Sequence, residues 1–205
     1  MYKGRLFVIS GPSGAGKGTI CRELLDRDQE GKTRLSVSMT TRPPREDEEE
    51  GADYYFVSEA EFNMIIDERG FLEHAEVYGH FYGTPKLEVL DMMDEGADVI
   101  LEIDIQGALQ VREAYPKAVF IFILPPSMAE LRKRITGRGS ETEESLERRL
   151  GEALEEVSYI DKYDYCVING ELQEAVGRVS AIIVAEHSRV SENIYETIEQ
   201  YKEEM

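Results

Sequence analysis

The chain has 205 residues, of which 41% are hydrophobic and 32% charged, and its 42 acidic and 23 basic residues give a formal net charge of −19. This length and composition predict a soluble globular protein with a substantial core of its own. The acidic excess argues against a polymeric nucleic acid as partner, because nucleic-acid phosphates require a basic surface. It still allows a small phosphate ligand held by a local cluster of arginines.

The cysteines and the N-terminal segment indicate the cellular compartment. Cys21 and Cys166 lie far apart and show no metal-binding spacing, which indicates no disulfide framework and favours a reducing environment. The first apolar run, residues 6–9, is too short for a signal peptide or a membrane span. We therefore expect a cytoplasmic protein with no membrane partner.

Short apolar runs alternate with helical patterns along the chain. The predicted strands cover residues 6–10, 99–103, 118–124 and 165–168, and the predicted helices cover 17–27, 127–136 and 171–187. Continuous runs rich in Val, Ile and Phe are typical of strands that are covered on both faces. The alternation predicts an α/β fold with an open, mostly parallel sheet flanked by helices.

Three segments depart from this alternation. Residues from about 36 to 85 are turn-rich, aromatic and charged, and indicate an inserted α+β subdomain within a core formed by about 1–35 and 86–205. Residues from about 137 to 145 form a polar segment, in which Ser140 and Glu143 have capping-box spacing. This segment fits a lid or an ordinary exposed connection equally well. In the tail, Ile194, Ile198 and Tyr201 have helical spacing, so we expect a terminal helix that docks on the core.

A phosphate-binding loop follows the first predicted strand. It consists of Gly11, Pro12, Ser13, Gly14, Ala15, Gly16, Lys17, Gly18 and Thr19. Two glycines with four residues between them, followed by lysine, match a P-loop, in which backbone N–H groups and the next helix N-terminus bind phosphate. Gly18 stands where a hydroxyl usually follows the lysine. Mg²⁺ would therefore meet Thr19 or keep mostly water ligands.

Two arginines flank a rigid Pro-Pro step further along the chain. Arg42 and Arg45 could present their guanidinium groups together, and such a pair suits a phosphate group. They could equally be exposed arginines that balance the acidic run at 46–50. The local sequence leaves both interpretations open.

The order of the motifs resembles that of the guanylate kinases over residues 5 to 170. The matching segments are the P-loop and those at 36–45, 51–56, 71–73, 82–84, 103–107, 125–127, 137–139 and 141–145. This resemblance implies a P-loop kinase with an inserted GMP-binding subdomain and a small lid. It also implies reversible transfer of the ATP γ-phosphoryl group to GMP and dGMP, with Mg²⁺, by a monomer or homo-oligomer.

The resemblance also implies roles for particular residues. The residues implied to bind the GMP phosphate are Arg42, Arg45, Tyr54 and Tyr82, and those implied to bind guanine are Ser38, Glu73, Thr84 and Asp104. The residues implied to stabilise the transferred phosphoryl group are Lys17, Arg42, Arg134, Arg138 and Arg149. Asn169 is implied to contact the adenine of ATP. A carboxylate accepts hydrogen bonds from guanine N1–H and its 2-amino group. Facing adenine it would stay unpaired, a mismatch that can cost about 10⁴-fold in discrimination.

Two alternatives remain beside this interpretation. Another small-molecule P-loop kinase, such as one acting on AMP or on a ribosyl bisphosphate, would not need both Glu73 and Asp104. A non-catalytic guanylate-kinase-like module that binds phosphopeptides would be expected beside other interaction domains and with a degraded P-loop. In this chain the P-loop lysine, Lys17, is intact, which argues against such a module.

Overall fold

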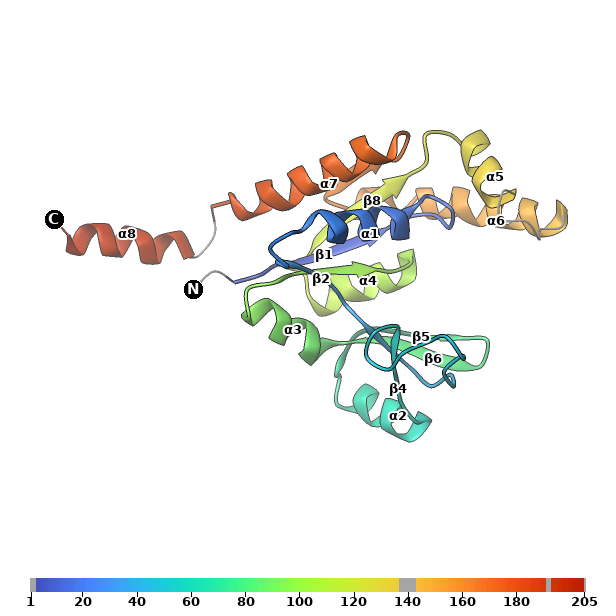
Figure 1. The fold of residues 1–205 in the computed structure, drawn as a ribbon, viewed down its shortest axis with the longest axis horizontal. Helices are drawn as coiled ribbons and strands as arrows, with labels where there is room; N and C mark the ends of the chain where they lie inside the picture. The colour runs from blue at the N-terminus through green and yellow to red at the C-terminus, as the bar shows by residue number, and fades with distance from the viewer. Residues whose placement is uncertain (1–2, 137–142, 191–192, 205) are drawn as a thin grey trace.

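The computed structural model describes residues 3–136, 143–190 and 193–204 (Figure 1). The strands are β1 (Leu6–Ser10), β2 (Thr33–Leu35), β3 (Ser38–Thr40), β4 (Tyr54–Phe56), β5 (Phe71–Val77), β6 (His80–Pro85), β7 (Asp98–Glu102), β8 (Val119–Leu124) and β9 (Tyr165–Ile168). The helices are α1 (Lys17–Arg27), α2 (Glu59–Asp67), α3 (Lys86–Asp94), α4 (Ile105–Ala114), α5 (Met128–Thr136), α6 (Glu143–Val157), α7 (Leu172–His187) and α8 (Asn193–Glu203), with a short 3₁₀ helix at Ile160–Lys162.

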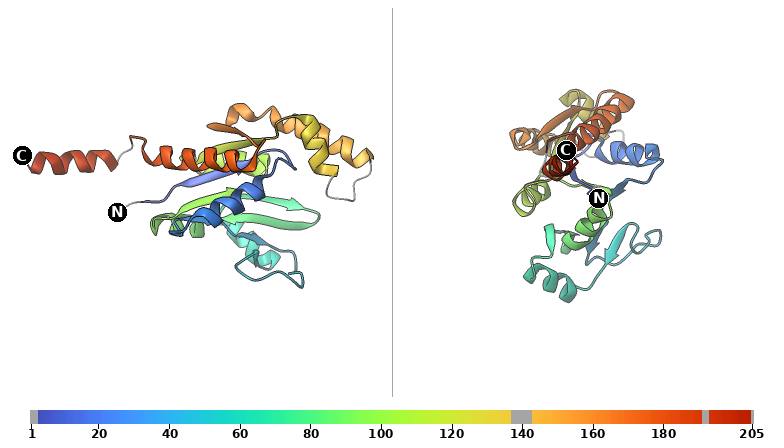
Figure 2. Two further views of the ribbon diagram at one scale, coloured as in Figure 1. Left: turned by 45° about the horizontal axis from the view of Figure 1, so that its top comes forward. Right: turned by 90° about the vertical axis from the view of Figure 1, so that its left-hand side faces the viewer.

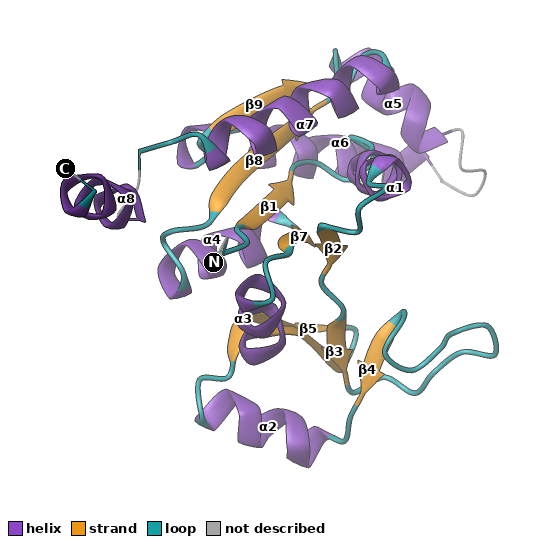
Figure 3. Cartoon of the chain, turned by 60° about the vertical axis from the view of Figure 1, so that its left-hand side comes forward, coloured by secondary structure: helices purple, strands orange, loops and turns teal. Residues whose placement is uncertain are grey.

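The main sheet has five strands in the order β2-β7-β1-β8-β9, and every neighbouring pair is parallel (Figure 3). Helices α1 and α7 cover one face, and α3 and α4 cover the other. The predicted α/β fold with a mostly parallel sheet is confirmed. The predicted bounds of β1 and β9 are correct, and those of β7 and β8 differ by one residue.

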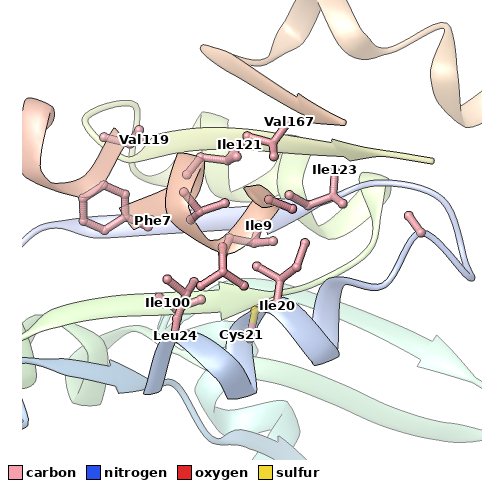
Figure 4. Close-up of a cluster of buried hydrophobic side chains, with 14 residues drawn as sticks. Phe7, Ile9, Ile20, Cys21, Leu24, Ile100, Val119, Ile121, Ile123 and Val167 are labelled. Atoms are coloured by element: carbon pink, nitrogen blue, oxygen red, sulfur yellow. The ribbon is translucent and has the colours of Figure 1, made fainter. Parts of the chain in front are cut away.

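The central strand β1 is buried along its whole length because its side chains serve two cores. Phe7 and Ile9 pack in the layer of α1 and α7, together with Leu24 (Figure 4). Leu6 and Val8 point to the opposite layer, that of α3 and α4. Side chains alternate between the faces of a strand, so a strand covered on both faces is apolar throughout.

A second sheet, in the order β4-β3-β6-β5, is built from residues 38–85 and lies to one side of the main sheet (Figure 1). Its β3–β4 pair is parallel and its other pairs are antiparallel. Helix α2 closes one face, because the fully buried Phe62 stacks on Phe71 and Phe81 with centroid distances of 4.4 and 5.5 Å. Ser58 and Glu61 form a capping box that fixes where α2 begins.

The C-terminal tail differs from expectation. Helix α8 forms, but it projects away from the body of the molecule (Figures 1 and 2). Ile194, Ile198 and Tyr201 are 39%, 38% and 63% exposed. The expected docking on the core is wrong, because α8 extends beyond the end of α7 instead of folding back against the body (Figures 1 and 2). Among the described helices, none combines the length and apolarity needed to cross a membrane.

Candidate active site

The loop between β1 and α1 adopts a shape that requires glycine. Gly11 and Gly16 have φ values of 139° and 94°. A Cβ atom on Gly11 would lie 2.2 Å from the carbonyl oxygen of Ile123, and one on Gly16 would lie 2.4 Å from Nδ2 of Asn169. Side chains at these positions are therefore excluded, and the loop can wrap around a cavity that faces the N-terminus of α1.

This cavity has a volume of about 430 Å³. It is lined by Gly11, Ser13, Gly14, Gly16, Lys17, Gly18, Thr19, Arg22, Glu102, Asp104 and Glu156. The ammonium group of Lys17 donates to the carbonyl oxygens of Gly11 at 2.6 Å and Pro12 at 3.3 Å. Burial lowers the pKa of Lys17 below its usual value. The cradle thus combines backbone N–H groups, a helix N-terminus and a mobile cation, which suits the phosphates of a nucleotide.

Two residues predicted for the site, Asn169 and Arg134, hold this loop through the carbonyl oxygen of Ala15. The side-chain amide of Asn169 donates to the carbonyl oxygen of Ala15 at 2.8 Å. Arg134 donates to the same oxygen at 3.3 Å and to the carbonyl oxygen of Asn169 at 2.9 Å. The cradle is therefore held by hydrogen bonds from α5 and from the end of β9.

The other predicted cations near the cradle belong to the lid region. Arg149, on α6, donates from Nη2 to the hydroxyl of Ser13 at 2.8 Å. Arg138 and most of the predicted lid, at 137–142, lie outside the described residues. The remaining residues assigned to the lid, 143–145, form the start of α6.

A second cluster, in the smaller sheet, gathers three of the predicted phosphate ligands. Nε of Arg42 donates to the hydroxyl of Tyr82 at 3.2 Å, and the guanidinium carbon lies 5.6 Å from the centroid of the Tyr54 ring. The rings of Tyr54 and Tyr82 meet edge to face with centroids 5.9 Å apart. Strands β3 and β6 are paired, and β3 is paired with β4, so the topology brings these distant residues together.

Glu48 completes this cluster, and sequence analysis missed it. Its carboxylate accepts from Nη2 of Arg42 at 2.7 and 2.9 Å and from the backbone N–H of Arg45 at 2.9 Å. Nη1 of Arg45 lies 4.0 Å from Oε1 of Glu48. The side chain of Arg45 is 71% exposed, whereas that of Arg42 is only 14% exposed. The hydrogen bond from Arg42 lowers the pKa of Glu48. The sequence signal for Glu48 was its position three residues after Arg45, but the acidic residues around it concealed this signal.

A pair of carboxylates lies where the two sheets meet. Glu73, on β5, accepts from the hydroxyl of Thr84 at 2.6 Å, and burial raises the pKa of Glu73. Asp104 caps α4 by accepting from the backbone N–H of Gly107 at 2.8 Å. Both carboxylates lie beside Gly107. Ser38, the fourth residue predicted for this group, is the first residue of β3. The following residue, Met39, pairs with Gly83, which directly precedes Thr84 on β6.

The side chain of Gln110 fixes how these carboxylates lie relative to each other. Its amide accepts from the backbone N–H of His74 and donates to the carbonyl oxygen of His74, both at 3.1 Å. This contact fastens β5 to α4, and so joins the strand that carries Glu73 to the helix that Asp104 caps.

Two further carboxylates face the phosphate cradle and were also missed. Glu102 ends β7, two residues before Asp104, and the end of an apolar parallel strand was a usable signal for it. Glu156 belongs to α6, and burial raises its pKa. The sequence around Glu156 gives no comparable signal, because it is a helix rich in glutamate.

The parallel sheet, the glycine-rich loop after β1 and the adjoining carboxylate pair define the class of the protein as a P-loop kinase. The guanylate kinase family model matches residues 3–200. The guanylate kinase of Clostridium acetobutylicum is 60% identical over 92% of this chain and 88% of the relative, and that of Caldanaerobacter subterraneus is 56% identical over 93% and 92%. A crystal structure of guanylate kinase from Anaplasma phagocytophilum has a TM-score of 0.70 and 37% identity over 92% of this chain and 89% of that one.

The chain belongs to the guanylate kinase family. The predicted family and the predicted enzymatic function as a nucleoside monophosphate kinase are confirmed, and the relatives favour this function over a non-catalytic binding module.

Proposed function

We propose that this protein transfers the γ-phosphoryl group of ATP to GMP, and also to dGMP, in a reversible reaction. The observation that carries this proposal is the place of Asp104. Asp104 lines the cavity of the P-loop and also stands beside Glu73. A phosphate cradle and a candidate site for a nucleobase edge therefore adjoin each other at Asp104.

Guanine is the base that suits the carboxylate pair. Its N1–H and 2-amino groups are donors on one edge, and Glu73 and Asp104 offer acceptor oxygens at one place. Adenine has an acceptor at N1 and no amino group at C2, so the half-buried Glu73 would lose a partner. Thr84, which is 1% exposed, holds the Glu73 carboxylate, and Ser38 starts the adjoining strand.

The acceptor phosphate of GMP suits the cluster around Arg42. Arg42 and Arg45 supply positive charge, and the hydroxyls of Tyr54 and Tyr82 supply donors. Arg42 is held on three sides by Tyr82, Pro43 and Glu48. A guanidinium that is already ordered loses little entropy when a phosphate binds.

Lys17 and the arginines Arg134, Arg138 and Arg149 are proposed to stabilise the charge of the transferred phosphoryl group, together with Arg42. Phosphoryl transfer is catalysed mainly by positioning and charge stabilisation, and a phosphate oxygen of GMP is already ionised, so no general base is needed. In this structure Lys17 rests on loop carbonyl oxygens, from which it can swing to a phosphate. Asn169 is proposed to adjoin the adenine of ATP.

The cradle also fits Mg²⁺, which prefers oxygen ligands and keeps several waters. Thr19 and the carboxylate of Glu102 line the same cavity, and Glu102 approaches within 3.1 Å of the position of a Cβ atom on Gly18. These oxygens would hold the ion with water and nucleotide phosphates. No cluster of three or more His, Cys, Asp or Glu suited to a metal occurs among the described residues. Bound Mg²⁺ would supply positive charge to the phosphates of ATP.

We also propose that residues 36–85 act as the GMP-binding unit, that residues 137–145 act as a lid, and that the enzyme works in the cytoplasm on small molecules alone. Closure of both parts would exclude water, which would otherwise hydrolyse ATP.

A coupled assay of ADP release tests the proposal. Mg·ATP is combined in turn with GMP, AMP, CMP and UMP, with the Lys17→Met variant as the inactive control. We expect strong turnover with GMP alone. Turnover with AMP but not GMP would contradict the assignment of Glu73 and Asp104. A folded protein that binds GMP without turnover would instead support a binding module.

A further inference from the structure

We propose that Gly107 is a specificity-determining residue, because the absence of a side chain at this position gives both carboxylates room to face one purine edge. This inference rests on the proposed function and adds to it a residue that acts by having no side chain.

The space around Gly107 is filled by the two carboxylates. Gly107 is buried in the first turn of α4. A Cβ atom built on it would lie 3.2 Å from Oε2 of Glu73, 3.5 Å from Cδ of Glu73 and 3.4 Å from Oδ1 of Asp104. The first of these distances is shorter than ordinary van der Waals contact, so a methyl group at Gly107 would displace a carboxylate by a few tenths of an ångström.

Neither carboxylate can move without losing a contact. Asp104 accepts from the N–H of Gly107 itself at 2.8 Å, so a shift of Asp104 would weaken the cap of α4. Glu73 is held by Thr84 at 2.6 Å, and its strand is fastened to α4 by Gln110. The Glu73 carboxylate projects from a longer side chain, so we expect it to turn away and lose its alignment with the 2-amino group of guanine.

Helix stability alone would favour a different residue. Replacing a glycine inside a helix with alanine generally stabilises the helix. Gly107 is not among the glycines with positive φ, so alanine meets no backbone strain there. Alanine at this position should therefore favour the helix and disfavour the site, and the two effects can be measured separately.

The test compares Gly107→Ala with Gly177→Ala. Gly177 lies inside α7, and a Cβ atom placed on it would meet no neighbouring side chain within 4 Å, so this variant reports helix propensity alone. For each variant the KM values for GMP, IMP and ATP and the melting temperature are measured. IMP is the probe because it keeps N1–H but lacks the 2-amino group.

We expect Gly107→Ala to remain folded and to raise the KM for GMP by about tenfold or more, since a misplacement of 1 Å in an active site can cost on the order of 10²-fold. The KM for IMP should rise less, so that the preference for GMP over IMP falls, and the KM for ATP should stay within about twofold. Gly177→Ala should leave all three KM values unchanged.

A second comparison tests whether the loss acts through the Glu73 carboxylate. In a Glu73→Gln background, Gly107→Ala should add little further loss of GMP use, because the same interaction is already removed. Losses that simply multiply, an unchanged GMP to IMP preference, or a parallel rise in the KM for ATP would overturn the inference. If the wild type does not use GMP at all, the proposed function itself fails, which is a distinct result.

Discussion

At the scale of single residues, the same side chain serves different purposes according to its neighbours. The run at 46–50 contains four glutamates and one aspartate, yet only Glu48 turns toward Arg42, and its side chain is 12% exposed. Glu46 in the same run is exposed. We therefore expect Glu48 to act as a positioning residue for Arg42, the proposed phosphate ligand.

Replacing Glu48 with Gln should raise the KM for GMP roughly tenfold with a smaller change in kcat, because Arg42 loses its charged partner while the substrate contacts remain. The KM for ATP should not change. Glu46→Gln removes the same charge from the same loop and should have no effect. A lower KM for GMP in the Glu48 variant would show that Glu48 competes with the phosphate.

The pKa of Glu73 predicts a dependence on pH. Burial raises this pKa, so the carboxylate becomes protonated at a higher pH than an exposed glutamate and then loses acceptor capacity. The KM for GMP should therefore rise as pH falls toward the acidic range, and this rise should be absent in Glu73→Gln. A pH profile of kcat/KM for GMP makes the comparison.

The same burial has a consequence for stability. A carboxyl group with a raised pKa in the folded state destabilises the fold when it is ionised, and this penalty disappears as pH falls through the folded and then the unfolded pKa. Glu73→Gln should therefore raise the melting temperature at neutral pH, by about 2–4 °C for each kcal/mol, while GMP use falls. A lower melting temperature at neutral pH would contradict this account.

At the scale of elements, the P-loop is one continuous segment, but a residue that holds it by a hydrogen bond lies far away in the sequence. Asn169 lies 154 residues from Ala15, whose carbonyl oxygen it binds. Asn169→Ala would leave that oxygen with the weaker contact from Arg134 alone. We expect a higher KM for ATP, an unchanged KM for GMP and a loss of about 1–3 kcal/mol in stability. Asn169→Asp, which cannot donate there when ionised, should have a similar effect, and equal changes in both KM values would contradict this role.

The elements that could be predicted from sequence are those with a local signal. The apolar runs of β1 and β9 and the helix at 17–27 have the predicted bounds, because continuous apolar runs and a glycine-rich turn are strong local signals. The grouping of Glu73 with Asp104 came from resemblance to a family. The contacts of Gln110 and Gly107 could not be predicted, because they depend on how the second sheet packs against α4. Glu48 had a local signal in its spacing from Arg45, but the acidic run around it concealed that signal.

For the C-terminal helix, the sequence predicted the helix but not its position. Its apolar spacing correctly indicated a helix, but spacing cannot say whether the chain brings that helix back to the core. The direction of α8 depends on the turn after α7, for which residues 188–190 carry no distinctive signal.

At the scale of the whole molecule, helix α4 joins the two sheets. Its N-terminal cap, Asp104, faces the phosphate cradle of the main sheet, and Gln110 holds β5 of the second sheet. A change in the angle between the sheets would therefore alter the distance from the cradle to the Arg42 cluster. The net charge of −19 is compatible with anion binding, because Lys17, Arg42, Arg134 and Arg149 are concentrated at the two proposed phosphate sites.

The central claim is that both sites serve one transfer between two nucleotides. The most direct measurement follows the label from γ-labelled ATP in the presence of Mg²⁺ and GMP, with the products separated by chromatography. We predict that the label appears in the β-phosphate of GDP, that little appears in inorganic phosphate, and that GMP is required. Label that appears mainly in inorganic phosphate, or at the same rate without GMP, would contradict the claim.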